Sequence, residues 1–180
     1  MDSFVLQKLK QSLEWFIKNT VFSLGSDDAV TPLDILISFA APDSDFVLGL
    51  GSNPVINCYM VGIAEDKVRR QSDPLRTQLN VAKTKHKLQK EPRFVDISYM
   101  LTVWSPDKVG RADIEHLLLG QLISVLGAYD FLPAEILEKY ELDTTPYAVK
   151  HTLFGSENSE KVGGQVWQAM GSTPKPYLML

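Results

Sequence analysis

The residues that could perform catalysis are few and stand apart from one another in the sequence. The three histidines, His86, His116 and His151, lie in separate segments. None has a second histidine or a cysteine at the spacing of a zinc site, so the pattern does not predict a metal centre. Glu115 precedes His116, but adjacent residues on a helix point away from each other and do not form a pair. We therefore expect His116 to be a polar or interface residue of a helix.

Nucleophilic and phosphate-binding chemistry find equally little support. The only cysteine, Cys58, lies in an apolar run, where we expect a buried structural thiol. Residues Gly49–Gly51 form a short G-x-G, but a phosphate loop must link a strand to the start of a helix. This one precedes a strand, and no lysine or third glycine follows it at a useful spacing, so we expect a turn. The sequence predicts a protein without a cofactor that is not an enzyme.

The composition favours a folded, soluble protein. The apolar fraction of 44% and the charged fraction of 22% are ordinary for a globular domain. No apolar stretch approaches the ~20 residues that span a bilayer, and the first residues lack the basic start of a secretory signal. The formal net charge of -4 gives no overall attraction to nucleic acid or to anionic membranes. We expect synthesis in the cytoplasm and no membrane partner.

One segment departs from this acidic average. Residues 66–93 hold nine of the eighteen basic residues and three of the twenty-two acids, so this segment carries +6 and the remainder -10. With few large apolar residues, it should form a solvated loop or a hairpin arm. Nucleic-acid binding would require aromatic side chains among the charges, and there are none. An acidic protein surface is the favoured partner. The candidate partner-binding residues are Arg69, Arg70, Arg76, Lys83, Lys85, Lys87, Lys90 and Arg93.

Hydrophobic periodicity predicts the helices that flank these segments. Residues 1–20 form an amphipathic helix whose apolar face comprises Val5, Leu6, Leu9, Leu13, Phe16 and Ile17. Residues 113–129 form a longer helix capped by Asp113 or a neighbour, with a stripe of Ile114, Leu117, Leu118, Gln121, Leu122, Val125 and Leu126. A short helical turn follows Pro133. A last helix over 160–170 ends at Gly171.

Alternating and continuous apolar runs predict the strands. They cover residues 33–39, 55–63, 94–104, 149–154 and 177–180, and residues 42–54 form a connector. The run 55–63 is apolar on both faces and should lie inside the sheet. We predict one domain over 1–180 of the α/β (α+β) class, with a mixed, mostly antiparallel sheet packed by helices. The terminal strand, or the strand 94–104 with its basic arm, could accept a foreign strand along an open edge.

Three segments together resemble a known family. Pro92-Arg-x-x-Asp-x-x-Tyr-x-x-Thr-x-Trp104 precedes a leucine-rich helix that opens on Asp113 and His116. Near the end, residues 166–171 and 174–178 supply a tryptophan, a glycine, prolines and a strand. This combination resembles the tail-terminator, or cap, proteins of extracellular contractile injection systems. These systems are phage-tail-like particles of the antifeeding-prophage and virulence-cassette kind.

The resemblance implies a structural role. A cap of this family forms a homohexameric ring on the last tube and sheath rings, distal to the baseplate, and stops further polymerisation. The implied partners are other copies of the chain and the sheath and inner-tube subunits, in a particle that the cell can release. Two alternatives stay open at this point. One is a tail-completion or baseplate adaptor of a related particle, and the other is a nucleic-acid-binding protein that uses residues 66–93.

Overall fold

The computed structural model describes residues 3–21, 34–66, 77–79, 86–88, 94–106, 110–142, 147–154, 159–171 and 173–180. The chain forms two compact units. The first comprises Met1–Val61 and Tyr99–Leu180, and the second comprises Gly62–Ser98. The single domain expected over residues 1–180 stays a prediction.

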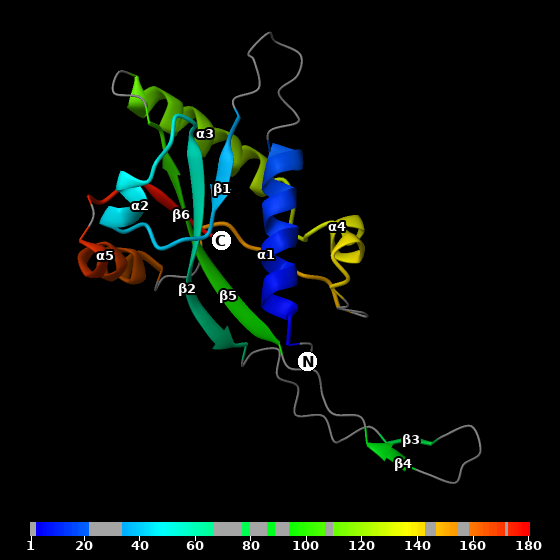
Figure 1. Cartoon of the computed structure of the whole chain (residues 1–180). Coiled ribbons are helices and arrows are strands. Elements are labelled where there is room, and N and C mark those ends of the chain that lie inside the picture. Colours follow the sequence, from blue (N-terminus) through cyan, green and yellow to red (C-terminus); the bar gives the residue numbers. More distant parts are fainter. Residues whose placement is uncertain are drawn as a thin grey trace. The chain divides into compact units, whose positions relative to one another are not determined.

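A four-stranded mixed sheet organises the fold (Figure 1). Its strands run in the order β1 (Leu36–Ser38), β2 (Val55–Glu65), β5 (Val95–Trp104) and β6 (Tyr177–Met179). β1 pairs in parallel with β2, and β6 pairs antiparallel with β5, with Met100 opposite Met179. The predicted fold class, a mixed sheet packed by helices, is confirmed. The prediction that the run 55–63 lies inside the sheet is also correct, because β2 has neighbours on both sides.

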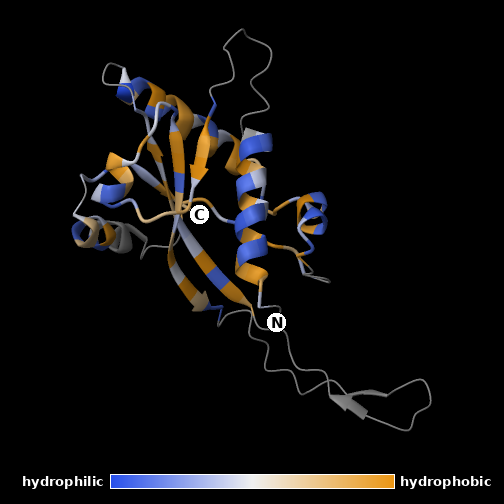
Figure 2. Ribbon diagram, viewed as in Figure 1, coloured by the Kyte–Doolittle hydropathy of each residue, from blue (hydrophilic) through white to orange (hydrophobic). Residues whose placement is uncertain are grey.

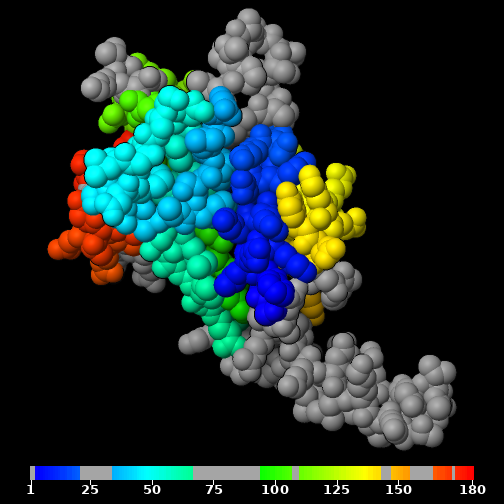
Figure 3. Space-filling model, in the orientation of Figure 1, coloured from blue at the N-terminus to red at the C-terminus, as the bar shows by residue number. Residues whose placement is uncertain are grey.

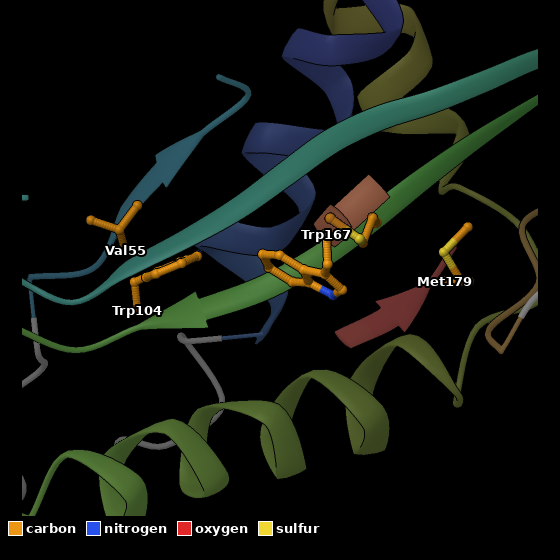
Figure 4. Close-up of a cluster of buried hydrophobic side chains, with 5 residues drawn as sticks. Val55, Trp104, Trp167 and Met179 are labelled. Carbon is orange, nitrogen blue, oxygen red and sulfur yellow. The ribbon is translucent and has the colours of Figure 1, made fainter. Parts of the chain in front are cut away.

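Side chains alternate between the two faces of the sheet, and helices cover both. One face carries Val55, Met100, Trp104 and Met179, which form a buried cluster with Trp167 (Figure 4). The next residue along each strand points to the other face. Figure 1 shows α2 and α5 on one side of the sheet and α1 on the other. This two-sided cover matches the continuous burial of the first four residues of β2 and the last six of β5.

The first face is covered by α2 (Ser44–Leu48) and α5 (Ser159–Met170). Phe46 of α2 meets Trp104 edge-on, with ring centroids 5.5 Å apart. Trp167 of α5 lies 6.4 Å from the same ring in a tilted arrangement. Sequence periodicity missed α2, which falls inside the predicted connector. Its first turn is fixed locally, because the Asp43 side chain accepts a hydrogen bond of 2.9 Å from the Phe46 amide.

The second face is covered by α1 (Val5–Phe16), which continues into the π-helical turn η1 (Ile17–Val21). Leu13, Phe16 and Ile17 are buried. α4 (Ala134–Lys139) packs on α1, and Figure 3 shows their blue and yellow atoms side by side. The predicted helical turn after Pro133 is therefore present. Leu6, expected on the buried face, is exposed, and Ser12 is buried instead because its hydroxyl donates to the Lys8 carbonyl.

The long helix α3 (Arg111–Leu126) contacts η1 and buries Leu118, Leu122 and Leu126 at a spacing of four. Its start differs from the prediction. Gly110 occupies the cap position with φ of +73°, and Asp113 lies in the first turn without a capping bond. Glycine adopts this left-handed conformation at little steric cost. The cap position is therefore occupied by Gly110 and not by the acidic residue that we expected. Gly171, with φ of +64°, ends α5 as expected.

The strand predicted over residues 149–154 is wrong. Only an isolated bridge between Phe131 and Lys150 forms there. The His151 amide donates to the Asp130 carbonyl, and the Phe154 amide donates to Met179 at 2.7 Å. Phe154 also adopts φ of +75°, which no strand permits. The backbone groups of residues 149–154 therefore form hydrogen bonds with a loop and with β6, and no regular strand pairing forms.

The second unit contains the end of β2, the start of β5 and a small pair of strands. The Asp66 amide donates to the Phe94 carbonyl at 3.1 Å, which joins the two long strands. Beyond them, β3 (Thr77–Leu79) and β4 (His86–Leu88) pair antiparallel. We expected a loop or a hairpin arm here, and the structure describes these two strands of it.

We predict that Trp104→Ala lowers the free energy of unfolding by about 3–5 kcal/mol, because it removes the buried ring that α2 and α5 contact. Urea unfolding followed by circular dichroism measures the change. Ile63→Thr is the control, since Ile63 is 52% exposed and the change should alter stability by no more than about 0.5 kcal/mol. Equal effects of the two substitutions would contradict the packing described for Trp104.

Candidate functional site

The histidines do not come together in a site. His116 is exposed on α3, whereas the adjacent Glu115 is turned inward, as expected of neighbours on a helix. His151 packs against Phe16, and its Nε2 lies 3.1 Å from the Leu126 carbonyl oxygen. Within the described residues, no group of three histidine, cysteine, aspartate or glutamate side chains could hold a metal ion.

Cys58 is buried on the α1 side of β2, as expected of a structural thiol. Burial raises the pKa of its thiol far above the ordinary value, and the nearby Glu14 carboxylate raises it further. Burial also raises the pKa of the neighbouring Tyr99, with a smaller contribution from Cys58. A thiol that stays protonated and enclosed at neutral pH is a poor nucleophile.

The Gly49–Gly51 segment follows the end of α2 and leads into β2. No helix begins after it, so its amides do not gather at a helix start in the way that an anion site requires. The predicted turn is confirmed.

One charged pair is largely enclosed, and it serves as a brace. Lys175 Nζ pairs with Glu115 Oε1, and the two side chains are only 14% and 12% exposed. Nζ also donates to the Val103 carbonyl at 3.3 Å and lies 4.5 Å from the Trp104 ring centroid. Glu115 Oε1 accepts a further bond of 3.1 Å from the Ser105 amide. With every charge satisfied, the pair joins the start of α3 to the end of β5 and the segment before β6.

The predicted partner-binding residues fall almost entirely outside the described part of the chain. Lys87 lies in β4, where only the backbone is described. The other seven, from Arg69 to Arg93, lie outside the described residues, so their role stays a prediction.

The sheet order decides which strands lie at an edge. β5 lies between β2 and β6, and β6 pairs with Met100–Thr102, so this part of the long strand cannot accept a foreign strand. For the rest of β5 the suggestion stays a prediction. β6 lies at an edge, as our other suggestion requires, but the Phe154 amide already donates to the Met179 carbonyl on that side. At the opposite edge, the Leu36 amide donates to Pro54 of the chain leading into β2. In a parallel ladder the backbone groups alternate in direction, so those of Ile37 point outward.

Two exposed apolar surfaces were missed by sequence reasoning. The tip of α2 presents Leu48 at 84% exposure, although the stretch was read as a connector. The outer face of α3 presents Leu117 at 55% exposure, although this residue was assigned to the buried stripe. Leucine at either position satisfies a simple apolar pattern, so only packing reveals that these side chains remain outside the core.

Comparison with known proteins decides the family. The sequence matches the model of the Pvc16 N-terminal domain over residues 5–180. The chain belongs to the Pvc16 N-terminal domain family. A search of curated proteins found no significant match. The resemblance to tail terminators of contractile injection systems noted in the sequence is confirmed.

A solved structure supports the same fold. It is a cryo-EM structure of the sheath/tube terminator of the PVC extracellular contractile injection system in its extended state. The match has a TM-score of 0.62 at 14% sequence identity and covers 99% of this chain. It covers 55% of the terminator chain, so this Pvc16-family chain spans about half of that protein's length. In the part of the chain that is described, no helix has the length and apolar character to cross a membrane.

We predict that Lys175→Met and Glu115→Gln each lower the free energy of unfolding by about 3 kcal/mol, because each leaves an enclosed charge without its partner. The double variant should cost less than the sum of the two, which a double-mutant cycle in urea measures. The matched control is Lys18→Met in the exposed pair with Glu14, where the change should stay within about 0.5 kcal/mol. Additive losses at positions 115 and 175 would refute the brace.

Proposed function

We propose that this chain acts as a terminator of the sheath and tube in a contractile, phage-tail-like injection particle. The observation that carries the proposal is the fold match to the PVC sheath/tube terminator over 99% of the chain. Membership of the Pvc16 N-terminal domain family supports it independently of the structure. The protein would be made in the cytoplasm and become part of the assembled particle.

The proposed role is structural and non-enzymatic. The histidines lie apart, Cys58 is enclosed, and the buried ion pair of Glu115 and Lys175 is fully used in bracing three segments. What the described surface offers instead is apolar side chains and a sheet edge, which are the means of protein–protein association. Such features suit a protein whose activity is to bind other subunits and stop further addition.

The cap would act as a homohexameric ring that contacts the last sheath and tube subunits at the end distal to the baseplate. Subunits of a ring meet head to tail through two different surfaces. The basic segment 66–93, at +6 beside a remainder at -10, supplies charge that six copies would concentrate against an acidic rim. The outward backbone groups of Ile37 offer an edge to which an extended arm of a sheath subunit could add.

Particle length tests the function. We predict that deletion of this protein yields tubes and sheaths of irregular length, because nothing stops the addition of further rings. Length distributions from negative-stain electron microscopy measure the effect, with re-expression of the intact chain as the control. Particles of normal, uniform length in the deletion strain would refute the terminator role. A tagged protein found at the baseplate end would instead favour a baseplate adaptor.

Charge reversal tests the basic segment. We predict that glutamate at Lys83, Lys85, Lys87 and Lys90 weakens capping while changing thermal stability little, because exposed charge changes usually alter stability by less than about 0.5 kcal/mol. Capping is measured by particle length and folding by the melting temperature. Glutamine at the same positions is the matched control for loss of charge without reversal. A large loss of thermal stability would mean that this segment contributes to a folded core, contrary to the docking role.

A further inference from the structure

The outer face of α3 is unusually apolar for a helix at a protein surface. Opposite its buried leucines, it exposes His116, Leu117, Gly120, Ile123 and Ser124. From residue 114 to 126 the only charged residue is Glu115, and that side chain is turned inward to Lys175. Figure 2 shows α3 mostly orange beyond its first turn. A surface helix normally carries charged residues on its outer face, so this face resembles one that another protein covers.

Gly120, in the middle of that face, has no explanation within the chain. Glycine weakens a helix relative to almost every other residue. A Cβ at position 120 would meet no atom within 4 Å, and the backbone there is helical. Leu117 and Ile123 lie three residues to either side on the same face and are 55% and 39% exposed. The missing side chain therefore leaves a notch between two exposed apolar side chains, where a partner can approach the helix closely.

Gly164 in α5 shows that a glycine alone does not make this argument. It too is exposed in a helix, and a Cβ there would also meet nothing within 4 Å. Its exposed neighbour one turn further along the helix is Gln168. Among the described side chains on its face, Gly164 is therefore not flanked by exposed leucine or isoleucine, and it serves as a matched control.

The tip of α2 provides an apolar knob of complementary chemistry. Leu48 is 84% exposed and the adjacent Val47 is 38% exposed. Residues 46–52 carry no charge. The helix that presents the knob is held firmly, because Asp43 caps its first turn and Phe46 packs on Trp104.

We infer that the notch at Gly120 on α3 receives the α2 tip, with Leu48 at its centre, of a second copy of this chain. Within one copy the two surfaces do not meet, since α2 packs on the Trp104 side of the sheet and α3 contacts η1 beside α1. Two different surfaces of one chain that bind each other form a head-to-tail contact, which closes into a ring when the rotation permits. The inference rests on the proposed ring and names the contact that builds it.

The oligomeric state of the full chain in solution tests this contact. Mass photometry and analytical ultracentrifugation should detect self-association of the natural protein. Gly120→Gln, which fills the notch, and Leu48→Ser, which removes the knob, should each weaken association at least about tenfold, the effect of losing a single well-packed contact. At a concentration where the chain is monomeric, Gly120→Gln should raise the melting temperature by roughly 2 °C, because glutamine favours the helix more than glycine does and no contact between copies contributes.

The control and a compensating pair separate this contact from a general disturbance. Gly164→Gln should raise the melting temperature similarly without weakening association. Gly120→Lys and Leu48→Glu should each reduce association, and the two combined in one chain should restore part of it, because every contact in a head-to-tail ring then pairs lysine with glutamate. No recovery in the combined variant would overturn the pairing of these two surfaces.

Three further outcomes would overturn the inference: a natural chain that stays monomeric at every concentration, rings that persist in Gly120→Gln, or loss of sheath binding with rings intact. Particle length, measured for the same variants, separates this contact from the proposed function. Rings that persist in Gly120→Gln with normal particle length refute the contact and leave the terminator role standing. Rings lost in Gly120→Gln with particles still uniform support the contact and refute the terminator role.

Discussion

The fold depends on the environment of one side chain, Trp104 at the end of β5. Phe46 brings α2 to its ring, Trp167 brings α5, and Lys175 brings the segment before β6. The indole Nε1 donates to Thr102 at 2.9 Å, so the buried polar atom is also satisfied. Elements separated by more than a hundred residues thus meet at one ring. A large, rigid aromatic group can join several elements because its area is big and its conformers are few.

The Glu115–Lys175 brace explains how that centre can tolerate a charge. A lysine held above an indole face with a carboxylate and a carbonyl beside it retains favourable interactions on every side. The same contacts fix where α3 starts, because Glu115 is in its second turn and bonds to the Ser105 amide. The position of α3, and therefore of its exposed apolar face, follows from the packing at the end of β5. These contacts therefore connect the exposed apolar face of α3 to the core.

Much of the fold was predictable from residue patterns. Helices α1, α3, α4 and α5 and the strands β1, β2, β5 and β6 follow from periodicity and from glycine and proline signals, which depend only on local geometry. The helix α2 and the false strand over 149–154 show the limit. A five-residue helix that begins at the Asp43 cap has too few turns to show a hydrophobic period in the sequence. A short apolar run forms a strand only when a neighbouring strand supplies backbone groups for a continuous hydrogen-bond ladder.

For function, residue types at fixed spacing were sufficient to identify the family and to show that no catalytic motif is recognisable. The folded chain was needed to show that β5 lies between β2 and β6, that Glu115 meets Lys175 across sixty residues, and that Leu48, Leu117 and Gly120 face outward. Whether an apolar side chain ends in the core or at an interface depends on the neighbours that packing brings to it, and those neighbours are distant in the chain.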